Sequence, residues 1–169
     1  MSSAADEHRQ QAPRQIRCAV LTVSDTRTVE TDVGGRTVCE LLAEAGHAAA
    51  FRAICPDDPP RMRELLHAWE AQADLDAILV TGGTGISSRD QTYETVSQLL
   101  TKPLPGYGEL FRWLSYQQVG TAAMLSRAVG GLINRTVVLT MPGSPAAVRL
   151  AMQQVILPEL AHLVQQACK

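Results

Sequence analysis

Short apolar runs alternate with segments of helical apolar spacing along this chain, as in proteins whose strands and helices alternate. The continuous apolar runs predict strands at residues 16–23, 48–54, 75–81, 127–133 and 136–141. Apolar residues three and four positions apart predict helices at residues 36–46, 60–73, 91–100, 109–119 and 146–166. Pro158 lies inside the last of these segments and is expected to kink or divide that helix.

This order of elements predicts an α/β fold, with an open and mainly parallel sheet covered by helices on both faces. The 169 residues suit one domain, which we expect to span residues 16–169. Residues 1–15 are polar and predict a disordered tail rather than a signal peptide. No stretch has the roughly 20 apolar residues of a membrane helix. These features favour a cytoplasmic protein that binds no membrane.

Composition narrows the class of partner. Aromatic residues make up 4% of the chain and the net charge is −2, which argues against a general nucleic-acid binder. The four cysteines and four histidines are scattered, without a pair at metal-ligand spacing, which argues against a zinc site. Local arginines and backbone amides can still bind anions in a chain of near-neutral charge.

Residues 81–85, Thr-Gly-Gly-Thr-Gly, directly follow the strand predicted at 75–81. Glycines let the backbone approach a ligand closely, and successive amides with two threonine hydroxyls can form an anion-binding concavity. A tight structural turn is the alternative. The segment matches neither a P-loop nor the GxGxxG dinucleotide motif. Ligands of open parallel sheets bind beyond the carboxyl ends of the strands, where this loop falls.

Two aspartates follow strands of the same predicted sheet. Asp57 lies in the segment Cys-Pro-Asp-Asp-Pro-Pro after one strand, and Asp90 follows the glycine-rich loop after another. Carboxylates beside an anion-binding loop suit Mg²⁺, which prefers oxygen ligands and contacts phosphates. Asp58 and Asp90 can alternatively cap the helices that follow them, whereas Asp57 is not needed as a cap.

Other segments near the strand ends can contact a ligand or serve the fold alone. Ser24 and Asp25 end the first strand and can form a local turn. Residues 103–109 can form a lid, a substrate wall or a stiff connector. Arg127 can bind an anionic group or be an ordinary surface arginine. Ser144 is expected to cap the last helix, whose N-terminus suits a phosphate.

Taken in order, the segments SDT, PDD, TGGTGxxxRD, PGYGE, SRA and MPGSP resemble the MoaB/MogA family of molybdenum cofactor biosynthesis proteins. The resemblance runs from about residue 17 to residue 166 and is closer to the MoaB than to the MogA members. It implies a three-layer α/β/α sandwich of Rossmann-like type that assembles into trimers or hexamers. It also implies transfer of AMP from the co-substrate Mg-ATP to the phosphate of molybdopterin, with other proteins of that pathway as further partners.

The resemblance assigns roles to particular residues. The two acidic positions of the family's catalytic motifs fall on Asp57 and Asp90, the residues expected to bind Mg²⁺. The nucleotide- and pterin-binding positions fall on Ser24, Asp25, Gly82, Gly83, Thr84, Gly85, Arg89, Pro105, Gly106, Glu109, Ser126, Arg127, Gly143 and Ser144. Three arginines are candidates to compensate phosphate charge: Arg27, Arg89 and Arg127.

Two further functions compete with adenylyl transfer. The first is a pterin-binding or scaffold protein that does not consume ATP. The second is a nicotinamide oxidoreductase with the same kind of sheet, against which the missing dinucleotide motif counts. Self-association would be supported by an apolar surface at Val119, Ala122, Ala123, Met124 and Leu125.

Overall fold

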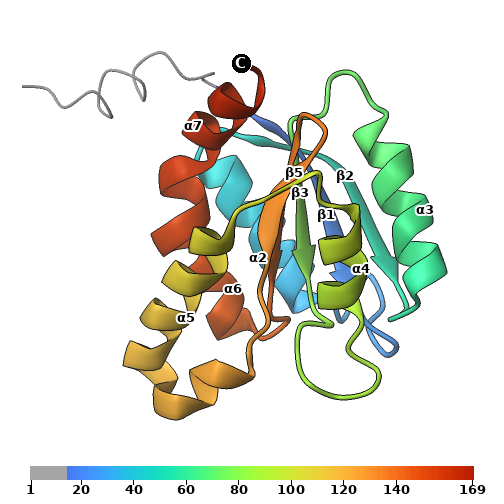
Figure 1. Ribbon diagram of the computed structural model, residues 1–169. Coiled ribbons are helices and arrows are strands. Elements are labelled where there is room, and N and C mark those ends of the chain that lie inside the picture. Colours follow the sequence, from blue (N-terminus) through green and yellow to red (C-terminus); the bar gives the residue numbers. More distant parts are fainter. Residues whose placement is uncertain (1–14) are drawn as a thin grey trace, which may run out of the picture.

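Four parallel strands and two strands with antiparallel pairing form a six-stranded sheet in the computed structural model, which describes residues 15–169 (Figure 1). The strands are β1 (Arg17–Val23), β2 (Ala48–Cys55), β3 (Ala77–Thr81), β4 (Lys102–Pro103), β5 (Gly130–Ile133) and β6 (Thr136–Met141). Their order is β2-β1-β3-β6-β5-β4. The strands β2, β1, β3 and β6 are parallel, and β5 runs antiparallel to both of its neighbours. The predicted open, mainly parallel sheet is confirmed. The tail predicted at residues 1–15 lies, apart from Gln15, outside the described residues.

Helices cover both faces of the sheet and complete three layers (Figure 1). They are α2 (Val33–Glu44), α3 (Pro59–Glu70), α4 (Thr92–Leu99), α5 (Pro105–Val119), α6 (Pro145–Ala151) and α7 (Leu157–Ala167), with a 3₁₀ helix η1 (Gly120–Leu125) and a π-helical turn η2 (Met152–Ile156). α3 and α4 pack on one face, whereas α2, α5, α6, η2 and α7 pack on the other. The predicted α/β/α sandwich is confirmed. Within residues 15–169, no helix is both long and apolar enough to cross a membrane.

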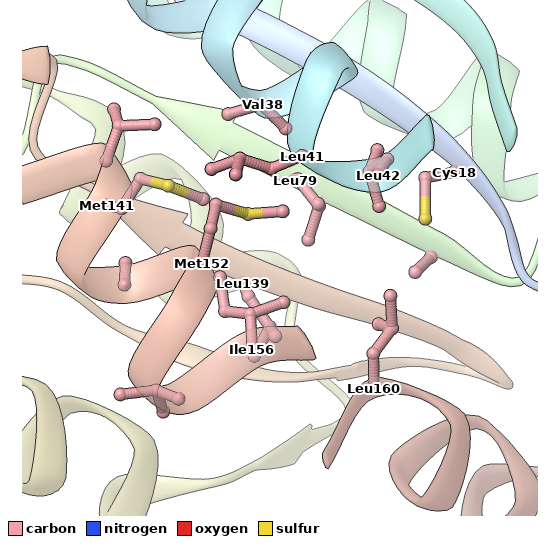
Figure 2. Packing of buried hydrophobic residues seen from close by; sticks show 14 of the residues in the cluster. Cys18, Val38, Leu41, Leu42, Leu79, Leu139, Met141, Met152, Ile156 and Leu160 are labelled. Atoms are coloured by element: carbon pink, nitrogen blue, oxygen red, sulfur yellow. The ribbon is translucent and has the colours of Figure 1, made fainter. Parts of the chain in front are cut away.

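The central strands are apolar throughout because successive side chains point to opposite faces and both faces are covered. Leu79 of β3 lies with Leu139 and Met141 of β6 against Met152 and Ile156 of η2, as Figure 2 shows. The neighbours of Leu79 along β3 pack with α3 and α4 on the opposite face. The continuous apolar runs of the sequence therefore correspond to strands with two cores.

Two helices begin earlier than their apolar spacing predicts. α5 begins at Pro105 rather than at residue 109, because proline fits a first helical turn, where its missing N–H is not needed. Residues 105–109 are therefore helical, so the expectation of a stiff connector there is wrong. α2 begins at Val33, since Asp32 accepts a hydrogen bond from the amide of Gly35. The strand predicted at 127–133 begins only at Gly130.

Pro158 divides the last helical segment, as predicted. The chain passes from α6 through the π-helical turn η2 into α7, and Pro158 lies in the first turn of α7. Proline has no N–H to donate and its ring crowds the carbonyl four residues earlier. The wide π turn accommodates both effects without ending the helical path.

The hydroxyl of Tyr107 attaches α5 to the sheet, and removal of this hydroxyl tests the attachment. The buried hydroxyl of Tyr107 donates a hydrogen bond to the carbonyl of Thr140 in β6 at 2.8 Å. We expect Tyr107→Phe to lower the free energy of unfolding by about 1–2 kcal/mol, because the buried carbonyl loses this donor. Tyr116→Phe is the matched control, since Tyr116 of α5 is exposed. Urea unfolding of both variants checks the prediction, which equal stabilities would contradict.

Candidate functional site at the carboxyl edge of the sheet

The loops that follow β1, β2, β3 and β6 meet at one end of the sheet, which we call the carboxyl edge. The amide of Ser24, after β1, donates to the carbonyl of Cys55 at the end of β2 at 2.9 Å. The amide of Gly82, after β3, donates to the carbonyl of Met141 at the end of β6, also at 2.9 Å. Segments that are far apart in the sequence are therefore in contact where a ligand of a parallel sheet binds.

The carboxylates of Asp57 and Asp90 lie against the same glycine-rich loop. A methyl group added to Gly83 would lie 2.6 Å from Oδ2 of Asp57, and one added to Gly85 would lie 2.7 Å from Oδ2 of Asp90. Gly83 also has a φ of +64°, which side chains disfavour. Glycine is thus required at both positions for the acids to approach the loop. The structure brings the two predicted acids to one site.

Asp57 is buried and caps a helix from a distant loop. Its Oδ1 accepts a hydrogen bond from the amide of Gln91, the residue before α4, at 3.0 Å. Burial raises the pKa of Asp57 above its ordinary value, and the charges of Asp90 and Asp25 raise it further, against the opposing effect of the Gln91 bond. The N-cap residue of α4 is Gln91, not Asp90. The Oδ2 atom of Asp90 instead accepts a hydrogen bond from the amide of Ser87 at 2.8 Å, outside the helix. The alternative in which Asp90 only caps α4 is therefore wrong.

Asp25 joins the two acidic loops. Its Oδ2 accepts hydrogen bonds from Nη2 and Nε of Arg89 at 2.7 and 3.0 Å, and its Oδ1 accepts from the amide of Asp57 at 3.1 Å. The bond from Arg89 lowers the pKa of Asp25, and the bond from the Asp57 amide lowers it further. Asp25 and Arg89, both predicted as ligand contacts, are paired with each other in this structure.

Two cavities open at the carboxyl edge and share Gly143 and Ser144. The α5 cavity, of about 360 Å³, lies between the glycine-rich loop and the elements α5, η1 and α6. The α2 cavity, of about 410 Å³, lies between the ends of β1 and β3 and the start of α2. The other predicted site residues that line the α5 cavity are Gly83, Thr84, Gly85, Asp90 and Ser126. Those that line the α2 cavity are Ser24 and Gly82.

The glycine-rich loop keeps three consecutive amides available. The N–H groups of Gly83, Thr84 and Gly85 have no hydrogen-bond partner within the described part of the chain. All three residues line the α5 cavity. Consecutive amides of this kind form a concavity that binds anions, because each N–H needs an acceptor.

A third cavity, the β4 cavity of about 560 Å³, is lined by some of the remaining predicted residues but not by Asp25, Asp57 or Arg89. Pro105 and Glu109 of α5 line it with Ser126 and Arg127, whereas its lining includes neither Asp57 nor Asp90. Gly106 is exposed beside it. Arg127 is half-buried, so it is not an ordinary surface arginine. Ser126 lines both the β4 cavity and the α5 cavity.

Asp32 is a residue of the edge that the sequence prediction missed. It is buried, it lines the α2 cavity, and its Oδ2 accepts hydrogen bonds at 2.8 Å from both Nη2 of Arg52 and Oγ1 of Thr22. These bonds hold the start of α2 against β1 and β2. The available signal was local, since an aspartate before a helical pattern is typical of an N-cap.

Asp57 and Asp90 are the candidate ligands for Mg²⁺. No group of three or more His, Cys, Asp or Glu side chains among residues 15–169 is arranged to hold a metal ion. Two carboxylates nevertheless fit Mg²⁺, which proteins bind through one or two carboxylates while substrate phosphates and water complete the shell. Their donor set therefore matches a metal that arrives with a nucleotide.

Comparisons with known proteins find relatives that match nearly the whole chain. The model of a family described as "Probable molybdopterin binding domain" matches residues 19–162. Molybdenum cofactor biosynthesis protein B of Bacillus cereus is 52% identical over 158 residues, which cover 93% of this chain and 94% of that protein. A crystal structure of molybdenum cofactor biosynthesis protein B is 50% identical, with a TM-score of 0.90, and the match covers 94% of this chain and 99% of that chain. A structure of MogA is 29% identical, with a TM-score of 0.80 and coverage of 89% and 99%.

The raised pKa of Asp57 predicts that this acid lowers stability at neutral pH. Folding raises the pKa of this carboxyl group, so its ionised form destabilises the folded protein. The destabilisation is absent below the pKa of the unfolded state, grows as the pH rises, and is complete above the pKa of the folded state. We expect Asp57→Asn to be more stable than the wild type at pH 7, since asparagine keeps the acceptor for Gln91. The gain should fade as the pH falls toward about 4.

Asp25→Asn is the matched control, with the opposite sign. The pKa of Asp25 is lowered by Arg89, so its ionised form stabilises the fold at pH 7 and the stability is lost as the pH falls. Thermal unfolding of both variants from pH 4 to pH 7 checks the pair. A less stable Asp57→Asn variant at pH 7 would show that ionised Asp57 is not penalised in the folded protein.

Proposed function

Because this chain belongs to the MoaB/MogA family of molybdenum cofactor biosynthesis proteins, we propose that it binds molybdopterin and transfers AMP to it from Mg-ATP. The observation that carries the proposal is the pair of carboxylates, Asp57 and Asp90, against a loop with three free amides. The pair suits a metal and the amides suit phosphate oxygens, so one loop can serve both parts of a metal nucleotide.

Adenylyl transfer requires little proton chemistry from the protein. An oxygen of the molybdopterin phosphate attacks the α-phosphorus of ATP, the bond from that phosphorus to the oxygen bridging to the β-phosphorus breaks, and pyrophosphate leaves. A phosphate monoester has its second pKa near 6 and is largely deprotonated at neutral pH, so no general base is needed. The main obstacle is repulsion between anions, and catalysis then rests on positioning and on charge neutralisation.

The residues of the edge divide these tasks. Asp57 and Asp90 would hold Mg²⁺, which when bound neutralises phosphate charge and fixes the orientation of the phosphates. The amides of Gly83, Thr84 and Gly85 donate to phosphate oxygens from the wall of the α5 cavity. The apolar part of that cavity, formed largely by α5, η1 and α6, suits a flat heterocycle.

Among the candidate arginines, Arg27 is the most available to a phosphate. Arg89 is paired with Asp25 and Arg127 is paired with Glu94. The guanidinium of Arg27 donates within the described residues only to the carbonyl of Thr31, at 3.2 Å, and Arg27 lines the α2 cavity. We therefore assign to Arg27 the charge compensation in that cavity.

A non-catalytic pterin-binding protein is the second candidate, and one observation favours it. Asp57 and Asp90 both make hydrogen bonds that the fold itself uses, to the amides of Gln91 and Ser87. Both acids therefore have a structural reason to be present even in a protein that never consumes ATP. Only an assay of turnover separates the two functions.

The test is formation of adenylylated molybdopterin and pyrophosphate by the purified protein with Mg-ATP. We expect Asp57→Asn and Asp90→Asn each to reduce turnover by about 100-fold or more, because each removes a charge proposed to hold Mg²⁺. Asp58→Asn is the control, since Asp58 is exposed and its side chain makes no cap hydrogen bond. It should keep turnover within about twofold. A wild-type protein that binds molybdopterin and leaves ATP intact would establish the second candidate.

Self-association is supported by an exposed apolar surface on α5 and η1. Val119, Met124 and Leu125, which the sequence prediction includes, are exposed, whereas Ala123 is buried. The surface also includes exposed Trp113, and water-exposed apolar groups of this extent favour contact with another protein. We propose a trimer or hexamer of this chain. Sedimentation at micromolar concentration checks the proposal, and a monomer would contradict it.

A further inference from the structure

Arg127 joins the glycine-rich loop to the segment that follows it, up to Asp90. Its Nε donates to the carbonyl of Gly85 at 2.7 Å and its Nη2 donates to the carbonyl of Asp90 at 3.0 Å. Its own amide donates to the carbonyl of Thr84 at 3.0 Å. One residue thus binds three carbonyls of the segment that carries the free amides and the second carboxylate, although it lies 42 positions from Gly85 in the sequence.

The guanidinium of Arg127 is itself held in place by the first turn of α4. Nη1 forms an ion pair with Oε1 of Glu94, and the guanidinium lies over the ring of Tyr93, 5.2 Å from its centre. The bond from Arg127 lowers the pKa of Glu94. Oε2 of Glu94 has no hydrogen-bond partner within the described residues, so Arg127 is the partner that holds this carboxylate. α4 therefore orients the guanidinium toward the loop.

Arg127 lines a different cavity from the one proposed to hold the substrates. Gly85 and Asp90 line the α5 cavity, whereas the lining of that cavity does not include Arg127, which lines the β4 cavity. All three nitrogens of the guanidinium already donate to protein oxygens. A phosphate in the α5 cavity would meet the loop that Arg127 supports rather than Arg127 itself.

From these contacts we infer that Arg127 is a positioning residue, which holds the glycine-rich loop and Asp90 in their mutual geometry and does not bind substrate phosphate. The expected effect of Arg127 on turnover rests on the proposed function, whereas its expected effect on the loop rests on the structure alone. Arginine is required because a planar fork can donate to two separate carbonyls and a carboxylate at once. A lysine ammonium carries the same charge without that fixed geometry.

The test compares Arg127→Lys with Arg17→Lys. Arg17 is the matched control because its guanidinium also binds a backbone carbonyl and a carboxylate, both of Asp74, at the opposite end of β1 from the site. Hydrogen exchange measures the loop through the amides of Ser87, Asp90 and Thr92, which are bonded within it or to Gly83. We expect these amides to exchange about tenfold faster or more in Arg127→Lys and unchanged in Arg17→Lys.

Steady-state kinetics measures the effect on the proposed reaction. Arg127→Lys should reduce kcat by about 10- to 100-fold, since small misplacement of catalytic groups has effects of this size, while the KM for Mg-ATP changes less than twofold. A KM raised tenfold or more, with kcat and loop exchange unchanged, would overturn the inference and make Arg127 a phosphate ligand.

Two further measurements keep the inference testable. If Arg127→Lys does not fold, Glu94→Gln removes the charged anchor and leaves the arginine; loop exchange should rise in the same direction, and unchanged exchange would contradict the inference. If the wild type shows no adenylyl transfer, the proposed function fails. The exchange comparison between Arg127→Lys and Arg17→Lys then decides the role of Arg127 by itself.

Discussion

Two carboxylates lie close against one glycine-rich loop at the carboxyl edge, and this contact constrains the residues around it. Asp57 and Asp90 occupy space that a side chain at Gly83 or Gly85 would fill. Two negative charges so near each other repel, and the pKa of Asp57 is raised by its burial and by those charges. Contacts with the surrounding structure must hold the two carboxylates in place, and their repulsion lowers the free energy of unfolding of the protein.

The hydrogen bonds that hold this arrangement come from distant parts of the chain. Asp25 of the β1 loop binds the amide of Asp57 and the side chain of Arg89, which ties three loops together. Arg127 lies between η1 and β5 and binds the carbonyls of Gly85 and Asp90. The parallel sheet makes these ties short, because it brings all of the loops to one end.

The sequence alone predicted five of the six strands, helices on both faces of the sheet and the meeting of the two acids, because these follow from local apolar runs and from the direction of parallel strands. It missed the two-residue strand β4, since Lys102 and Pro103 form no apolar run. It did not predict that Asp57 caps α4, since the amide of Gln91 lies 34 positions away and no local pattern encodes that contact. The role of Arg127 was hidden for the same reason. The apolar spacing of α5 also did not predict its first turn. The signal there is Pro105, because proline is common in the first turn of a helix.

The ion pairs of the arginines at the carboxyl edge explain how a chain with a net charge of −2 could bind an anionic ligand. Arg89 is neutralised by Asp25 and Arg127 by Glu94, so two of the three candidate arginines bring no surplus charge to an anionic ligand. Arg27 alone among the three binds no carboxylate within the described residues. Under the proposed function, a triphosphate beside two carboxylates would obtain most of its charge compensation from a divalent metal and from backbone amides. A site of that design needs acids more than bases, and it requires no basic composition in the chain that carries it.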